Sequence, residues 1–244
     1  MVKSISHLEI ELPVEKGLYA ITGQNGSGKS TLVTCASSVF FNMPMKDYFG
    51  ATEPDAYISS DFGNATRSWS KNEHGKWTPQ STGSMELKGF YEGSIIFGNR
   101  FRNTNYELLK QLDLINHDQL MDADEFIRSN LGRILHNNDG FYERLYRINS
   151  YQAGPEFTFR GDIFYYEKDG RRVSQFHMST GENMLVSILH SLHLRNTDRA
   201  SLTKPCVIFL DEIELALHPS SLKRLVVIIW SSIALMRLVR SLNT

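Results

Sequence analysis

The sequence has 244 residues, 41% of them hydrophobic, which is enough for one sizeable core with an inserted lobe but not for two large independent domains. Its 26 basic and 27 acidic residues give a formal net charge of -1, so overall charge gives no reason to expect nucleic acid as a partner. Cys35 and Cys206 lack metal-site spacing, and we expect them to be reduced core residues of a cytoplasmic protein.

No stretch of the sequence is expected to enter or cross a membrane. Residues 1–7 lack an apolar run followed by a cleavage site, which argues against a secretion signal. The most apolar part, Leu225–Trp230 continued by Ile233–Met236, is interrupted by Arg237 and Arg240 short of a spanning length. We therefore expect a soluble chain with no membrane partner.

The first third is predicted to begin with two strands and a helix. Residues 6–12 alternate apolar and polar side chains, which is typical of a half-buried strand. A second strand over Gly17–Thr22 leads into a glycine-rich turn, and a helix follows from Lys29 to about Phe41. Residues 43–100 are rich in glycine, serine and aromatic residues, with alternating runs such as Ser84–Tyr91, and predict strands and long loops.

A helical lobe is predicted next. From Asn105 to Ile148 the apolar spacing is helical, and Asp122 followed by Glu125 resembles a capping pattern at the start of a second helix. The positions that carry this spacing are Leu108, Leu109, Leu112, Phe126, Ile127, Leu131, Ile134 and Leu135.

The last third is predicted to hold a hairpin, a helix and a buried strand. Asp162–Lys168 and Arg171–Phe176 are β-prone runs joined through Asp169-Gly170, a favoured tight-turn pair. Apolar residues at helical spacing follow Ser179, and the wholly apolar run Cys206–Leu210 predicts a buried strand.

The glycine-rich turn carries residues suited to phosphate. Residues 23–30 fit the spacing G-x-x-x-x-G-K-[ST], after a strand and at the start of a helix. The glycines let backbone N–H groups face phosphate oxygens, Lys29 adds charge at the β and γ phosphates, Ser30 offers a hydroxyl to Mg²⁺, and Thr31 is placed to hold the α phosphate. An ordinary glycine turn needs neither the lysine nor the hydroxyl. The candidate nucleotide-binding residues are Gly23, Gln24, Asn25, Gly26, Ser27, Gly28, Lys29, Ser30 and Thr31.

Two adjacent carboxylates, Asp211 and Glu212, follow the predicted buried strand. At the carboxyl end of a parallel strand they would point into the ligand crevice beside the phosphate loop. Asp211 can then hold a magnesium-bound water, while Glu212 polarises the attacking water as general base. The alternative is a strand that ends in solvated acids. The candidate catalytic residues are Glu212 and Lys29, and the candidate metal ligands are Ser30 and Asp211.

The run Ser179-Thr180-Gly181-Glu182 fits a capping box, with Ser179 as N-cap and Glu182 returning to its N–H. It also resembles the signature motif of ATP-binding-cassette proteins, in which a Ser-x-Gly turn at a helix N-terminus contacts the γ phosphate held by the other subunit. Both uses employ the same helix end and are compatible. By this resemblance Ser179, Gly181 and Glu182 join the candidate nucleotide-binding residues.

The order of phosphate loop, helical lobe, signature run and acidic strand resembles an ATP-binding-cassette ATPase over residues 5–222. Residues 25–31 and 211–219, above all the Glu-x-x-Leu-His-Pro run after the acidic strand, are more similar to soluble relatives than to transporter cassettes. These relatives are the structural-maintenance and repair ATPases and overcoming-lysogenisation-defect nucleases (the SMC/RecF/OLD-like group), and the ATPase subunits of anti-phage systems such as Septu and some retrons. The resemblance implies ATP and Mg²⁺ as cofactors and a head-to-tail homodimer that encloses each nucleotide. Glu214–His218 would cross the dimer interface, or His218 would cap the helix opened by Pro219.

The implied fold class is α/β: a P-loop NTPase of the ABC-ATPase type, with a mixed β-sheet core, an N-terminal antiparallel β part and an inserted helical lobe. We expect a single ABC-type domain over residues 1–244. Its parts are a nucleotide-binding core with the β subdomain (1–102), the helical lobe (103–150), the signature helix and acidic-strand core (151–222) and an atypical or truncated C-terminus (223–244).

Two features of the family pattern have no counterpart in the sequence. Family members carry, after a further helix and strand, a histidine that reaches the γ phosphate, and this sequence reaches Thr244 without one. We expect truncation, or a last ~20 residues that depart from the ancestral sequence. Hydrolysis is then expected to be slow or to need a partner. No glutamine has the context of a magnesium sensor among Gln80, Gln111, Gln119, Gln152 and Gln175.

Three functions fit these motifs. The first is an ATPase whose ATP-dependent dimerisation regulates a partner nuclease, or a partner that includes a reverse transcriptase, in antiviral defence. The second is a DNA-repair or recombination ATPase that binds DNA as an ATP-gated clamp. The third is a transporter cassette, against which the Leu-His-Pro turn and the unfamiliar lobe argue. The arginines available for a DNA surface are Arg133, Arg144, Arg147, Arg160, Arg171 and Arg172.

Overall fold

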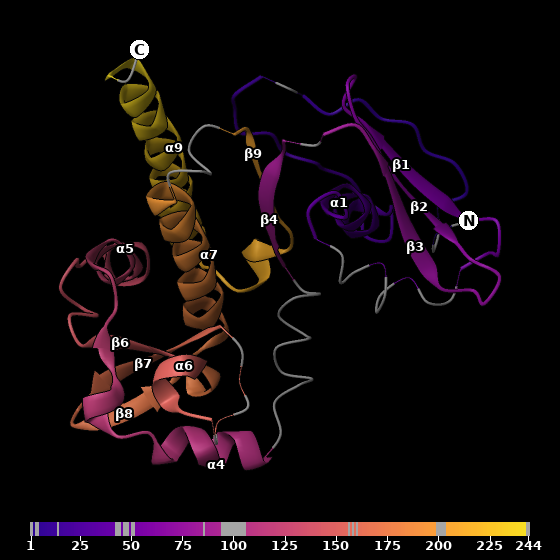
Figure 1. Cartoon of the computed structure of the whole chain (residues 1–244). Coiled ribbons are helices and arrows are strands. Elements are labelled where there is room, and N and C mark those ends of the chain that lie inside the picture. The colour runs from indigo at the N-terminus through magenta and orange to yellow at the C-terminus, as the bar shows by residue number, and fades with distance from the viewer. Residues whose placement is uncertain are drawn as a thin grey trace. The chain divides into compact units, whose positions relative to one another are not determined.

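The computed structural model divides into two compact units, whose helices and strands are labelled in Figure 1. Unit 1 contains Met1–Tyr91 and Thr203–Asp211, and unit 2 contains Glu92–Leu202 and Glu212–Thr244. The described residues are all except 1, 3–4, 14, 42–44, 46–48, 50–51, 85, 94–105, 156, 158, 160, 199–203 and 243–244, and of residues 106–108, 150 and 233–242 only the backbone is described.

One sheet of unit 1 packs against helix α1 (Lys29–Ser37) (Figure 1). The sheet is antiparallel in the order β1-β2-β3, with strands Tyr57–Asp61, Thr66–Lys71 and Trp77–Thr82. Trp69 and Trp77 are buried in an apolar cluster that includes Cys35 of α1. Burial raises the pKa of the Cys35 thiol to about 12, and both cysteines are free and half-buried, whereas core positions were predicted. The antiparallel β part of the predicted fold class is therefore present, at residues 57–82.

The other sheet of unit 1 pairs β4 (Lys88–Glu92) with β9 (Cys206–Leu210). A Cβ on Gly89 would come within 2.4 Å of the Val207 carbonyl oxygen and 2.5 Å of the Phe40 ring, so the close strand approach requires glycine. The Phe40 ring stacks on Phe209, and Phe41 stacks on Tyr91. Aromatic rings thus join the chain directly after α1 to both strands of this sheet.

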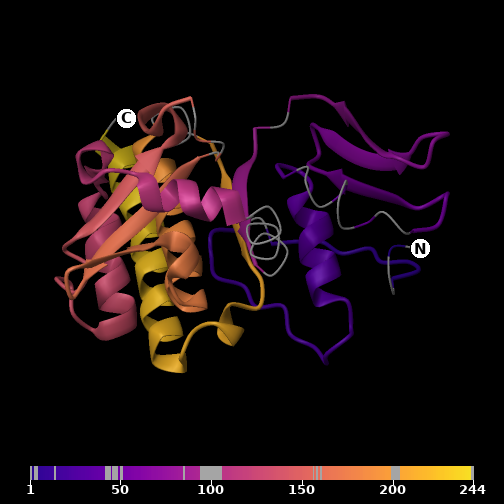
Figure 2. The ribbon, with the colours of Figure 1, turned by 90° about the horizontal axis from the view of Figure 1, so that it is seen from below.

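Unit 2 combines an antiparallel sheet with helices, and its sheet order is β5-β6-β7-β8. The strands are Met121–Asp122, Leu145–Asn149, Asp162–Lys168 and Arg171–Ser174; the helices are α4 (Tyr106–Leu114), α5 (Glu125–His136), α6 (Ser150–Ala153), α7 (Thr180–Thr197) and α9 (Pro219–Leu242). Helices α5, α7 and α9 pack together, as Figure 1 and the view from below in Figure 2 both show. Leu131, Leu189 and Leu225, one from each helix, are fully buried.

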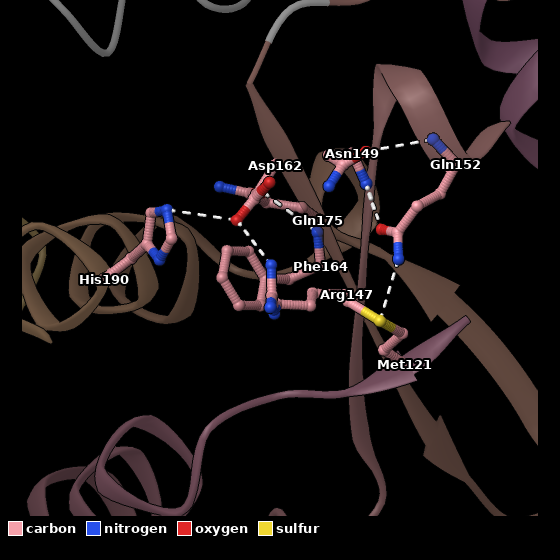
Figure 3. Close-up of polar contacts among 8 residues, drawn as sticks. All are labelled: Met121, Arg147, Asn149, Gln152, Asp162, Phe164, Gln175 and His190. Atoms are coloured by element: carbon pink, nitrogen blue, oxygen red, sulfur yellow. Dashed lines mark hydrogen bonds and ion pairs between the residues drawn. The ribbon is translucent and has the colours of Figure 1, made fainter. Parts of the chain in front are cut away.

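Buried and half-buried polar groups tie α7 to the sheet (Figure 3). Asp162, the first residue of β7, accepts a hydrogen bond from the Arg147 guanidinium at 3.1 Å and lies 3.3 Å from Nε2 of His190 on α7. Gln175 accepts from the Phe164 backbone N–H at 3.3 Å and donates to Asn183 at 3.1 Å. These bonds hold the first three turns of α7 in place against β7.

The two strands predicted at residues 6–12 and Gly17–Thr22 are absent, and those predictions are wrong. Both segments have irregular backbone, and Leu8 and Ile10 are each 50% exposed. A strand is stabilised by hydrogen bonds to a neighbouring strand and by burial of one face. Neither segment has a strand partner among the described residues, so the apolar alternation alone did not form a sheet.

Three predicted boundaries and one predicted burial are also corrected. Helix α5 is capped by Asp124, whose carboxylate accepts from Phe126 N at 2.8 Å, whereas Asp122 lies in β5. The helical pattern predicted up to Ile148 ends in strand β6, because residues 145–149 pair with β7. Helix α1 ends at Ser37 rather than near Phe41, and β9 is half-buried rather than fully buried. Met85, in the predicted run Ser84–Tyr91, and the side chain of Leu108, in the predicted helical lobe, lie outside the described residues.

The hairpin prediction is confirmed, although the second strand ends at Ser174 and not at Phe176. Strands β7 and β8 pair antiparallel, and Asp169 and Gly170 have φ angles of 51° and 71°, as a type I′ turn requires. Helix α9 carries apolar side chains on two faces: Leu225, Ile228 and Ile229 are buried, while Val227 and Trp230 are 62% and 51% exposed. The side chains of 233–236 are not described. None of the described helices combines the length and hydropathy needed to span a bilayer.

Candidate functional site

The phosphate loop forms an exposed turn that opens into α1. Gly28, the N-cap of α1, has a φ of 92° and Gly26 a φ of 81°, a left-handed conformation that favours glycine. Ser27 N–H donates to the Gln24 carbonyl at 3.2 Å and closes the turn, and residues 23–27 are exposed. The first turn of α1 contains no acidic residue, so no side-chain charge opposes an anion at its positive end.

Lys29 lies folded over this loop. Its ammonium donates to the backbone carbonyls of Gly23 at 2.8 Å and Gln24 at 2.9 Å. An ammonium carries three N–H groups, so these two bonds leave one N–H that can donate to an anion. Thr31, in contrast, is buried, and its predicted contact with the α phosphate stays a prediction.

Ser30 and Asp211 meet although 181 positions separate them in the sequence. The Ser30 hydroxyl donates to Asp211 Oδ1 at 3.2 Å, and the Tyr91 hydroxyl donates to Asp211 Oδ2 at 3.1 Å. Asp211 is 8% exposed and Tyr91 2%. We refer to Ser30, Tyr91 and Asp211 as the Asp211 cluster. Sequence reasoning missed Tyr91, because only the packing of β4 beside β9 brings position 91 to position 211.

Glu212 differs sharply from Asp211 in its surroundings. It is exposed and has a φ of 57°, which a non-glycine residue adopts at a cost of about 1 kcal/mol or more. It starts the short 3-10 turn η3 (Ile213–Leu215). Asp211 is therefore buried and hydrogen-bonded, whereas the neighbouring Glu212 is exposed to solvent. The general-base role of Glu212 stays a prediction.

The signature run begins α7 with the predicted capping box. Glu182 accepts from Ser179 N–H at 2.8 Å, and the Ser179 hydroxyl accepts from Glu182 N–H at 3.3 Å. The second carboxylate oxygen of Glu182 accepts from the Tyr142 hydroxyl at 2.5 Å, and Tyr142 is 1% exposed. Burial, and then the bond to Glu182, raises the pKa of Tyr142. We refer to Tyr142, Ser179 and Glu182 as the Glu182 cluster.

Gly181 and His218 have local structural roles in unit 2. A Cβ on Gly181 would come within 2.7 Å of the Ala216 carbonyl oxygen, so the start of α7 packs directly on the turn before α9. His218 accepts from Ser220 N–H at 3.3 Å, and its carbonyl accepts from Ser221 and Leu222 N–H. His218 therefore caps α9, with Pro219 at the first helical position, which is one of its two predicted uses.

The sequence around the phosphate loop shows the family to which the chain belongs. Residues 2–141, more than half of the chain, match a protein family described as an AAA domain. The chain belongs to this family. It is a family of P-loop ATPases of the SMC/RecF-like group, the kind of domain that binds and hydrolyses ATP. A search of curated proteins gave no match. The ATPase match contains Ser30 and Tyr91, whereas Ser179 and Asp211 lie beyond it.

The residues of this ATPase domain fit ATP with magnesium. The loop has left-handed glycines, an exposed backbone and a lysine, and the Asp211 cluster sets a hydroxyl beside a carboxylate, which are the oxygen donors that magnesium uses together with substrate phosphates. The described residues contain no group of three or more His, Cys, Asp or Glu placed to hold a metal, and a magnesium ion that shares its ligands with phosphates needs none.

Several of the other candidates have local contacts within unit 2. Gln119, Gln152 and Gln175 use their amides in unit 2 to hold nearby backbone or side chains. Arg133, Arg144 and Arg147 each pair with a carboxylate, on Asp139, Glu167 and Asp162. Arg172 lies over the Tyr165 ring, and Arg160 is outside the described residues. Of the six arginines named for a DNA surface, Arg133, Arg144 and Arg147 therefore each have a carboxylate that offsets their charge.

Proposed function

We propose that this P-loop ATPase is of the ABC type and hydrolyses magnesium-bound ATP between two copies arranged head to tail. The observation that carries the proposal is the bond of Ser30 to Asp211, which joins the phosphate loop to the acidic strand. Ser30 and Asp211 would hold magnesium directly or through water, and Lys29 with the loop N–H groups would hold the β and γ phosphates. Magnesium, when bound, offsets the charge on those phosphates.

Glu212 would orient and deprotonate the attacking water. An exposed carboxylate directly after the metal-binding acid is available to a water molecule, whereas Asp211 has both oxygens engaged. General-base catalysis of this kind contributes typically about 10²–10⁴-fold.

The second copy would supply the signature turn. Ser179 and Thr180 are exposed at the N-terminus of α7, where N–H groups lack intrahelical acceptors and the helix dipole favours an anion. Contact with the γ phosphate of a partner copy would use these groups, and ATP would then hold the dimer together.

The dimer is proposed to regulate a partner effector, a nuclease of an antiviral system. The support is the resemblance of the Leu217-His218-Pro219 turn to soluble defence and repair ATPases. A DNA clamp is the less favoured function, because Arg133, Arg144 and Arg147 are paired with carboxylates.

The test is Glu212→Gln in the full chain, with Glu143→Gln, another exposed glutamate, as control. We expect Glu212→Gln to bind ATP, to lose at least about 100-fold in turnover and to accumulate as an ATP-bound dimer in size-exclusion chromatography with light scattering. The control should behave as the wild type. Unchanged turnover would remove the assigned role of Glu212, and a variant that stays monomeric with ATP would contradict the two-copy site.

A further inference from the structure

Asp211 is held at both carboxylate oxygens. Ser30 donates to Oδ1 at 3.2 Å and Tyr91 donates to Oδ2 at 3.1 Å. Two donors on opposite oxygens prevent the carboxylate from rotating about its Cβ–Cγ bond. A carboxylate has about four lone-pair sites, so each oxygen can still accept from a metal-bound water.

The Tyr91 ring is itself fixed. It stacks on Phe41 with ring centroids 6.1 Å apart and is 2% exposed. Tyr91 shares a strand face with Gly89, since side chains alternate along β4, and at Gly89 the strand lies directly against Phe40 and the Val207 carbonyl. These contacts, all with residues of unit 1, aim the hydroxyl at Asp211.

We propose that Tyr91 is a positioning residue that orients Asp211 for magnesium in the ATP site. This inference rests on the proposed function, because it assigns Asp211 to the metal. Groups that orient a metal ligand without touching the metal typically raise metal affinity about 10–100-fold. Unit 1 consists of two segments, and Tyr91 and Asp211 are their last residues. The bond therefore joins the ends of these two segments.

The test is Tyr91→Phe, which keeps the ring and removes only the hydroxyl. Binding of a fluorescent ATP analogue to the full chain is measured in chelator and across a Mg²⁺ titration. We expect the Mg²⁺ concentration at half-maximal enhancement to rise about 10–100-fold. Tyr165→Phe is the matched control, since Tyr165 is a buried tyrosine of unit 2 whose hydroxyl donates to the Leu112 carbonyl at 3.1 Å; it should keep the wild-type midpoint.

A second arm separates positioning from general destabilisation. In an Asp211→Asn background, Tyr91→Phe should add no further shift, because the pair acts together. If Tyr91→Phe fails to fold, Phe41→Leu, which removes the stacked ring, should raise the midpoint in the same direction. An unchanged midpoint in Tyr91→Phe, or fully additive shifts, would overturn the inference alone. A wild type whose ATP binding does not respond to Mg²⁺ would overturn both the inference and the proposed function.

Discussion

The two units each hold a serine near a helix N-terminus, a carboxylate and a buried tyrosine that donates to that carboxylate. In the Asp211 cluster the three residues come from α1, β4 and the end of β9. In the Glu182 cluster two of the three are neighbours within one helix turn, and only Tyr142 comes from elsewhere. The Asp211 carboxylate is oriented beside the phosphate loop, whereas both oxygens of Glu182 accept hydrogen bonds that fix the start of α7.

The difference shows that similar residues can serve binding in one place and local stability in the other. Glu182 gives one oxygen to Ser179 N–H and the other to Tyr142, which are bonds that fix the helix start. Asp211 accepts from the side-chain hydroxyls of Ser30 and Tyr91, and Ser30 is the residue that would bind magnesium with it. We therefore expect the Asp211 cluster to control turnover, and Tyr142 and Glu182 mainly to stabilise the helix start that presents Ser179.

The largest expected effect is a loss of kcat/KM in Asp211→Asn, compared with the matching carboxylate-to-amide change Glu182→Gln in the other cluster. Asp211→Asn should lower kcat/KM for ATP by about 100-fold or more, because one anionic metal ligand is lost. Glu182→Gln should lower it much less and should cost about 1 kcal/mol of unfolding free energy through the weakened cap. Steady-state ATPase assays and urea unfolding measure the two quantities. Equal losses of kcat/KM would end the proposed division of roles.

A smaller effect is expected from Tyr142→Phe. Removing this buried hydroxyl leaves one oxygen of Glu182 without its donor, and we expect a loss of about 1–3 kcal/mol in unfolding free energy. Tyr151→Phe is the control, because Tyr151 is 95% exposed and its loss should fall within about 0.5 kcal/mol. If both variants unfold at the same urea concentration, Tyr142 does not support the start of α7.

The smallest effect concerns pH and unit 2. Burial lowers the pKa of His190 below its ordinary 6.5, outweighing Asp162, which raises it, while Arg147 and His193 lower it further. Because the unfolded chain then binds the proton more readily, stability is greatest above about pH 6.5 and falls as pH drops through that value towards the folded pKa. His190→Gln should flatten this fall in urea unfolding at several pH values. The exposed His74→Gln should leave it as in the wild type.

Predictions from sequence succeeded where contacts are short in range. The phosphate loop, the Asp169-Gly170 hairpin and the Ser179-Glu182 capping box are each formed by residues within a few positions, whose backbone angles and bonds follow from glycine, turn and cap chemistry. Predictions failed for residues 6–12 and Gly17–Thr22, because strand formation depends on a partner that periodicity does not reveal.

Residue types and their spacing were enough to place this chain among ATP-binding P-loop proteins and to name Lys29, Ser30, Asp211 and Glu212 as candidates. The tertiary structure decided which of these meet: it brings Ser30 to Asp211 across 181 positions, adds Tyr91 through the pairing of β4 with β9, and leaves Glu212 exposed. The physical reason is that a cap or turn closes within one helical turn, whereas a metal-binding carboxylate is oriented by donors that only strand pairing and core packing deliver.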